Sequence, residues 1–168
     1  GGGGGRGWRR GGVAGRRADA GSGGPLKAAD GANVVGRSSG GGGSDLKSCY
    51  VVVPRGYVQH SFAPDGGQAM AFTARYGYVG LAVERSEFVA EGLNEEGLSA
   101  GLFYFPGYGR YVEFDAAQRG ASIADLQVVP WILGSCRTVL QGQAAAARGR
   151  SLAVSARVCR SSPRVCSR

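Results

Sequence analysis

The sequence of 168 residues has only one histidine, His60, and four cysteines. No triad signature surrounds His60, and we interpret it as a surface loop residue. The cysteines show neither CxxC spacing nor neighbouring histidine pairs, which argues against a zinc site. Their positions are Cys49, Cys136, Cys159 and Cys166. We therefore expect no metal and no cofactor.

Long apolar runs are also missing. No stretch approaches the roughly 18 consecutive apolar residues of a membrane span. The basic start of the chain is not followed by the apolar segment of a secretory signal. These patterns argue against a membrane partner, and they leave the compartment open.

Acidic residues are missing from both ends of the chain. Residues 1–17 contain five arginines, residues 137–168 contain seven, and neither range contains an acid. Residues 18–136 hold eight basic residues and all twelve acids, so the net charge of +8 belongs to the ends. The middle therefore argues against nucleic acid as a partner. A basic, disordered nucleic-acid binder that uses the arginine-rich ends stays an alternative.

Composition predicts three regions. More than half of the 32 glycines precede Ser44. Residues 1–29 are rich in glycine and arginine and cannot bury enough apolar surface to fold, so we expect disorder there. Residues 139–168 read as a basic, low-complexity tail. The folded domain is expected at residues 30–138, with a flexible GGGGS linker at residues 40–44.

The middle of the chain predicts an α+β fold, in which an antiparallel sheet packs against one helix. Apolar and β-branched runs predict strands at 49–54, 69–75 and 78–83, and a hairpin that pairs 87–93 with 98–105. Asn94 is expected to cap the hairpin turn with its side chain, and Gly97 to adopt a positive φ there. Ser122 is expected to cap a helix that Pro130 then kinks.

Four segments carry a family resemblance. They are PRGY (54–57), TARYG (73–77), EGLNEEGLSAGLFYFPGY (91–108) and SIADLQVVPWILGSC (122–136). Together they resemble the choloylglycine hydrolase family, which includes bile salt hydrolases and penicillin V acylases. The resemblance implies a hydrolase of linear amide C–N bonds with an N-terminal nucleophile. It also implies a fold of two sheets between two helical layers (αββα), of which this chain supplies about half.

The resemblance implies two site residues. The segment DGANVVGRSS (30–39) is similar to the family's opening hairpin, which puts Arg37 in the place of the arginine beside the nucleophile. Arg37 could instead be a solvated residue at the edge of the linker. Tyr104 falls at an oxyanion or substrate position, where penicillin V acylases carry tyrosine. It could instead simply pack on a strand.

The sequence departs from the family at the nucleophile. Counting back from Arg37 places the attacking cysteine near Gly21, where the sequence has none. The family's aspartate is also missing, because Gly40-Gly41 stands where it is expected. The first cysteine is Cys49, for which a structural role is expected.

We therefore expect a truncated and inactive copy of the hydrolase, whose partner would be a small-molecule amide if it were active. The alternative is a noncatalytic remnant or binding fragment. A sheet with an uncovered apolar face also predicts self-association.

Overall fold

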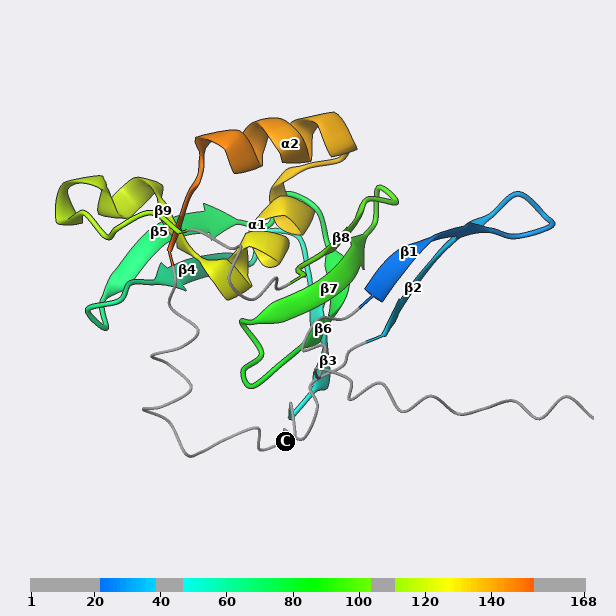
Figure 1. Cartoon of the computed structure of the whole chain (residues 1–168), viewed down its shortest axis with the longest axis horizontal. Helices are drawn as coiled ribbons and strands as arrows, with labels where there is room; N and C mark the ends of the chain where they lie inside the picture. The colour runs from blue at the N-terminus through cyan, green and yellow to red at the C-terminus, as the bar shows by residue number, and fades with distance from the viewer. Residues whose placement is uncertain (1–21, 39–46, 104–110, 153–168) are drawn as a thin grey trace, which may run out of the picture.

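A computed structural model describes residues 22–38, 47–103 and 111–152 (Figure 1). These residues form an α+β fold of mostly antiparallel strands and two α-helices. The expected fold class is confirmed at this level. In the part of the chain that the structure describes, neither helix has the length and hydropathy that a membrane span requires.

The central sheet has the strand order β3-β6-β7-β8, and its neighbouring strands are antiparallel. Its strands are β3 Cys49–Val53, β6 Tyr78–Ala82, β7 Val89–Asn94 and β8 Ser99–Gly101. Valine and tyrosine favour strands because they fit a pleated, half-buried surface. The predicted strands at 49–54 and 78–83 and the predicted hairpin are confirmed, with ends shifted by a few residues.

The described residues also form three further strand pairs. They are the β1–β2 hairpin (Ser22–Lys27 and Asn33–Ser38), the β4–β5 pair (Val58–Phe62 and Gln68–Thr73) and the parallel β9–β10 pair (Ser122–Ala124 and Arg150–Leu152). Strand β5 covers most of the predicted strand at 69–75. Strand β4 was not predicted, although its buried and exposed residues alternate. His60 lies on β4 and is exposed, so its surface position is confirmed and its expected loop position is wrong.

The two helices are α1 Val128–Ser135 and α2 Val139–Arg148, and two short 3-10 helices precede them, η1 Ala116–Ala121 and η2 Asp125–Gln127. The prediction that Ser122 caps a helix is wrong. Ser122 lies in β9, and its hydroxyl donates to the carbonyl of Gln118 at 2.9 Å. Pro130 lies in the first turn of α1, where a backbone N–H has no partner within the helix, so its missing N–H costs no hydrogen bond. The prediction that Pro130 interrupts the helix is therefore wrong.

Helix α2 forms from residues that composition assigned to a tail. Alanine has the highest helix propensity, so the run Ala144–Ala147 favours a helix. The hydroxyl of Thr138 caps it by accepting from the backbone N–H of Gln141 at 3.2 Å. Helix α2 and β10 thus lie beyond the expected domain end at 138, and β1 lies before the expected start at 30.

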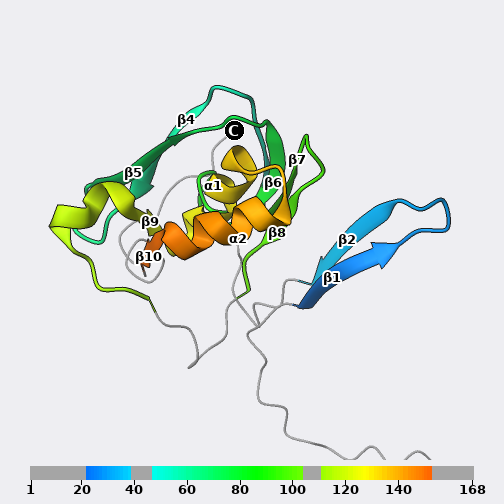
Figure 2. The same cartoon turned by 90° about the horizontal axis from the view of Figure 1, so that it is seen from above.

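Helix α1 covers one face of the central sheet. The buried cluster between them consists of Tyr78, Ala82, Val89, Val129 and Leu133. Burying a side chain of the size of leucine or valine contributes about 1.5–3 kcal/mol. In Figure 2, α1 and α2 lie on one side of the central sheet and the β1–β2 hairpin lies on the other.

The other face of the central sheet is called the open face here, and it carries Tyr50, Val52, Val79 and Leu93. Tyr50 is 89% exposed and Val52 is 77% exposed. The helices therefore cover one face of the sheet, while apolar side chains on the opposite face stay accessible.

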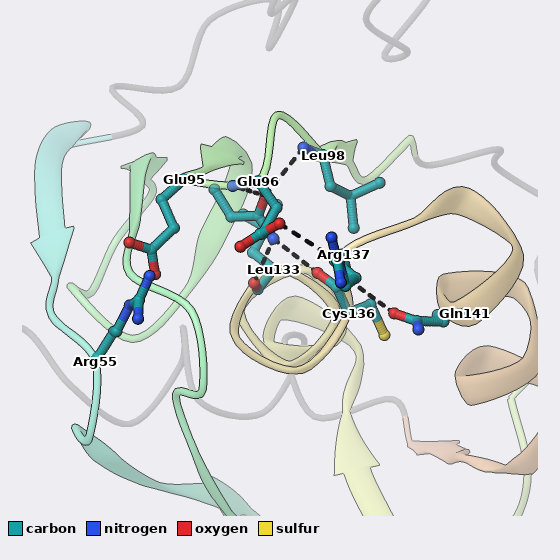
Figure 3. Close-up of polar contacts among 9 residues, drawn as sticks. Arg55, Glu95, Glu96, Leu98, Leu133, Cys136, Arg137 and Gln141 are labelled. Carbon is teal, nitrogen blue, oxygen red and sulfur yellow. Dashed lines mark hydrogen bonds and ion pairs between the residues drawn. The ribbon is translucent and has the colours of Figure 1, made fainter.

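Asn94 joins the β7–β8 turn to the end of α1, and its side chain is buried. Its amide nitrogen donates to the carbonyls of Leu133 at 2.9 Å and Cys136 at 2.7 Å. Its oxygen accepts from the backbone N–H groups of Glu96 at 3.1 Å and Leu98 at 2.9 Å (Figure 3). The predicted cap of the turn is confirmed, and the contact with the helix is an addition that the sequence did not indicate. Gly97 has the predicted positive φ, at +81°.

Two ion pairs flank the same turn (Figure 3). The Nε atom of Arg55 lies 2.6 Å from Oε1 of Glu95, and the Nε atom of Arg137 lies 3.4 Å from Oε2 of Glu96. The hydrogen bond from Arg55 lowers the pKa of Glu95, and a second one from the backbone N–H of Gly77 acts in the same direction. Exposed pairs of this kind add little stability, so Asn94 is the main polar anchor of the turn.

Replacing Asn94 by alanine should lower the free energy of unfolding by about 2–4 kcal/mol, because four backbone groups lose their partner in a buried site. Urea unfolding measures the loss. As a control, Gln143→Ala on the exposed side of α2 should change stability by less than about 0.5 kcal/mol. Equal effects of the two substitutions would contradict the role of Asn94.

Alkaline pH should destabilise the fold through Tyr78. Burial raises the pKa of Tyr78 to about 12, whereas an unfolded tyrosine titrates near about 10. Between these values the unfolded chain releases the phenol proton and the folded chain keeps it, so the stability present below pH 10 is lost as the pH rises. The urea midpoint should fall more steeply above about pH 9.5 in the wild type than in Tyr78→Phe. Parallel curves for the two proteins would exclude this effect.

Candidate functional site

A cleft of about 730 Å³ lies between the β1–β2 hairpin and the open face of the central sheet. Its exposed apolar wall residues are Val35, Tyr50, Val52, Val79, Leu93 and Phe103. Binding sites for small molecules are usually concave, mostly apolar and supplied with a few polar groups. The cleft has this character, because the charged residues among its lining are limited to Arg37 and Glu91.

Strand register builds the floor of the cleft from two parallel rows of side chains. The first row crosses the four strands as Tyr50, Leu81, Glu91 and Gly101, and the second as Val52, Val79, Leu93 and Ser99. The rows are two residues apart along each strand, which is about 7 Å. Glu91 is thus the single acidic group in a floor that is otherwise apolar or small.

Arg37 lies on β2 and reaches across the cleft to β7. Its Nη1 donates to the backbone carbonyl of Ala90 at 3.0 Å, and its Nε lies 3.7 Å from the carboxylate of Glu91. The guanidinium also stacks over the ring of Phe103, with Cζ 4.6 Å from the ring centroid. The side chain of Arg37 is only 13% exposed. The interpretation of Arg37 as a solvated linker residue is therefore wrong, while its catalytic role stays a prediction.

The hairpin approaches the sheet closely at Gly23, which pairs with Arg37 across β1 and β2. A Cβ atom added at Gly23 would lie 2.8 Å from the Cζ atom of Phe103, which is closer than real Cβ contacts allow. Glycine at this position lets the hairpin rest against the aromatic ring. Arg37 and Gly23 together fix the hairpin edge of the cleft.

Sequence reasoning missed Glu91 and Phe103 as members of the site. A signal for Glu91 was present, because it is an acid inside an apolar strand, two residues from the exposed Leu93 and on the same face. Phe103 had no such signal, because an aromatic residue after a strand is common. Tyr104, the other predicted site residue, lies outside the described residues, as does position 21, where the cysteine was expected.

Neither cysteine that the structure describes faces the cleft. Cys49 packs against the core cluster beneath the sheet, on the face opposite Tyr50. Cys136 is buried at the C-terminal end of α1. Burial raises the pKa of the Cys136 thiol, which lowers the thiolate fraction and hence its reactivity. The position of Cys49 agrees with the structural role expected for it.

Comparison with protein families gives a match over most of the chain. Residues 25–154 match the family described as linear amide C–N hydrolases, choloylglycine hydrolase family. The matched range contains the β1–β2 turn, the central sheet and both helices, and it is more than half of the chain. The search of curated proteins returned no match.

Replacing Arg37 by alanine should free the β1–β2 hairpin, because one side chain supplies a hydrogen bond, an ion pair and a stacking contact to the sheet. We expect the amides of β2 to exchange with deuterium at least about tenfold faster, which corresponds to about 1.4 kcal/mol. Arg55→Ala is the matched control, since Arg55 is an exposed arginine that pairs with Glu95. Unchanged exchange in Arg37→Ala would show that other contacts hold the hairpin.

Proposed function

The chain belongs to the choloylglycine hydrolase family of linear amide C–N hydrolases, and we propose that it binds a linear amide in its cleft without cleaving it. The observation that carries the proposal is the placement of Arg37. It is held at the wall of an apolar cleft. The family resemblance assigns it the position beside the nucleophile, yet the sequence has no cysteine near position 21.

Cleavage in this family requires a thiolate that attacks the amide carbonyl and an α-amine on the same residue that moves the proton. Position 21 is glycine, which has no side-chain nucleophile. Cys49 cannot replace it, because β3 turns Cys49 toward the core and away from the cleft. The proposed binding surface is thus present without a nucleophilic cysteine at the family position.

Other features support a binding role for the cleft. The row of Val52, Val79 and Leu93 offers an apolar floor to an acyl chain. The carboxylate of Glu91 gives Arg37 an acidic partner, although Gly40-Gly41 replaces the family's aspartate. Arg37 therefore stays ordered at the polar end of the cleft, where the amide of a ligand would lie.

Two finer assignments belong to the same proposal. The first is that the central sheet, with helices on one face, is half of an αββα arrangement with an N-terminal nucleophile. Tyr104 stands where penicillin V acylases carry tyrosine, which favours a phenoxyacetyl-type amide over a conjugated bile salt. Both assignments rest on the family resemblance.

The test combines a binding assay with a turnover assay on the full chain. Penicillin V should bind, as measured by calorimetry, and no free amine should appear with or without iodoacetamide. Leu93→Ala in the cleft floor should weaken binding about three- to tenfold through lost apolar contact. Leu140→Ala on the exposed side of α2 should leave binding unchanged.

Amine release that iodoacetamide abolishes would overturn the proposal, because it would require a working cysteine. Absence of binding to penicillin V and to a glycine-conjugated bile salt would overturn the binding role. A tighter complex with the bile salt would overturn only the acylase-like assignment.

A further inference from the structure

The cleft contains one pair of opposite charges, and its two members are not equally accessible. Arg37 and Glu91 are the charged residues among the cleft lining, and the Nε atom of Arg37 lies 3.7 Å from Oε2 of Glu91. The side chain of Arg37 is 13% exposed, whereas that of Glu91 is 34% exposed. A ligand that enters the cleft therefore meets the acid more readily than the base.

The protein itself occupies much of the Arg37 guanidinium. Its Nη1 donates to the backbone carbonyl of Ala90 at 3.0 Å, and one face of the group stacks over the ring of Phe103. Gly101 leaves space for it, because a Cβ atom added there would lie 3.4 Å from Nη1 of Arg37. These contacts hold the guanidinium against the sheet, so less of its positive charge is available to an anionic ligand.

Glu91 is less engaged by its partner than Arg37 is by the sheet. The separation of 3.7 Å from Nε of Arg37 is longer than the roughly 2.7–3.2 Å of a hydrogen bond, so the two groups form an ion pair without one. Glu91 lies in the cleft floor between Leu81 and Gly101 of the neighbouring strands. An ionised carboxylate only accepts hydrogen bonds, so this part of the floor offers a ligand an acceptor with negative charge.

The place of this charge matters for the amine part of a bound amide. In the proposed function, the amide of the ligand lies at the Arg37 end of the cleft. In penicillin V and in a glycine-conjugated bile salt, a carboxylate belongs to the amine part and is a few bonds from the amide nitrogen. Such a group would come close to Glu91, where like charges repel and where an unpaired charge is costly to place among apolar side chains.

We propose that Glu91 is a specificity-determining residue, which selects amides whose amine part carries no carboxylate. The proposal rests on the proposed function, since it requires an amide beside Arg37. It adds a separate determinant, because the apolar floor contacts the acyl part of the ligand and Glu91 faces the amine part. The ligand class is therefore an N-acyl amine that is uncharged on its amine side.

The test compares the binding of penicillin V with that of its methyl ester, which differ in the charge of one group. Calorimetry on the full chain at low salt should show the ester binding about tenfold more tightly than the acid. Glu91→Gln keeps the size of the side chain and removes its charge, which leaves Arg37 without an acidic partner. This variant should lose the preference for the ester, a change in the ratio of the two dissociation constants of about tenfold.

Glu96→Gln is the matched control. Glu96 also pairs with an arginine, with Oε2 at 3.4 Å from Nε of Arg137, and its side chain is 29% exposed. It lies in the β7–β8 turn and is not among the residues that line the cleft. Glu96→Gln should therefore keep the preference of the wild type for the ester.

A second measurement needs no variant. The wild-type preference for the ester should narrow in about 1 M sodium chloride, where the Debye length is about 3 Å. Three outcomes would overturn the inference and leave the proposed binding role standing: a wild type that binds the acid as tightly as the ester, a Glu91→Gln protein that keeps the full preference, and a preference that salt leaves unchanged. Absence of binding by both compounds would instead overturn the proposed function, and the inference with it.

Discussion

The buried amide of Asn94 is the interaction on which the arrangement of the site depends. It binds two carbonyls at the end of α1 and two N–H groups in the β7–β8 turn. Strand β7 carries Glu91 and Ala90, which hold Arg37, and Phe103 follows β8. The Asn94 side chain joins the β7–β8 turn to helix α1. The strands that form the floor of the cleft are therefore held in place by contacts on the opposite face of the sheet.

A glycine in β7 lets helix α1 approach the sheet closely. A Cβ atom added at Gly92 would lie 2.5 Å from the carbonyl oxygen of Val79 and 2.7 Å from Cδ1 of Leu133. Helix α1 therefore packs close to the backbone of β7, which a larger residue would prevent. Branched and aromatic side chains lie on both faces, but α1 buries those on its own face and leaves those on the other face in an apolar cleft.

Local patterns predicted local structure well in the central sheet and poorly around α1. The turn at Asn94 and Gly97 was predictable because its residue preferences arise from backbone geometry alone. Ser122 is a plausible helix cap in sequence, but β10 pairs with residues 122–124 and draws them into a strand. Strand pairing over about 28 residues of sequence separation leaves no mark in a local pattern, so tertiary contact overrode the cap. The alanine run of α2 was misread because composition alone does not distinguish a helix from a low-complexity tail.

The sequence by itself determined the α+β class, the family, the hairpin with its glycine turn, and the absence of a cysteine near position 21. These features depend on residue identity and short-range spacing. Only the tertiary structure decided that Arg37 meets Glu91 and Phe103, and that Cys49 points away from the cleft while Tyr50 points toward it. Arg37 and Glu91 are far apart in the chain, and their contact arises because the hairpin folds over the sheet. The face of the sheet to which a side chain points likewise depends on strand register, because a shift of one residue exchanges the two faces of a strand.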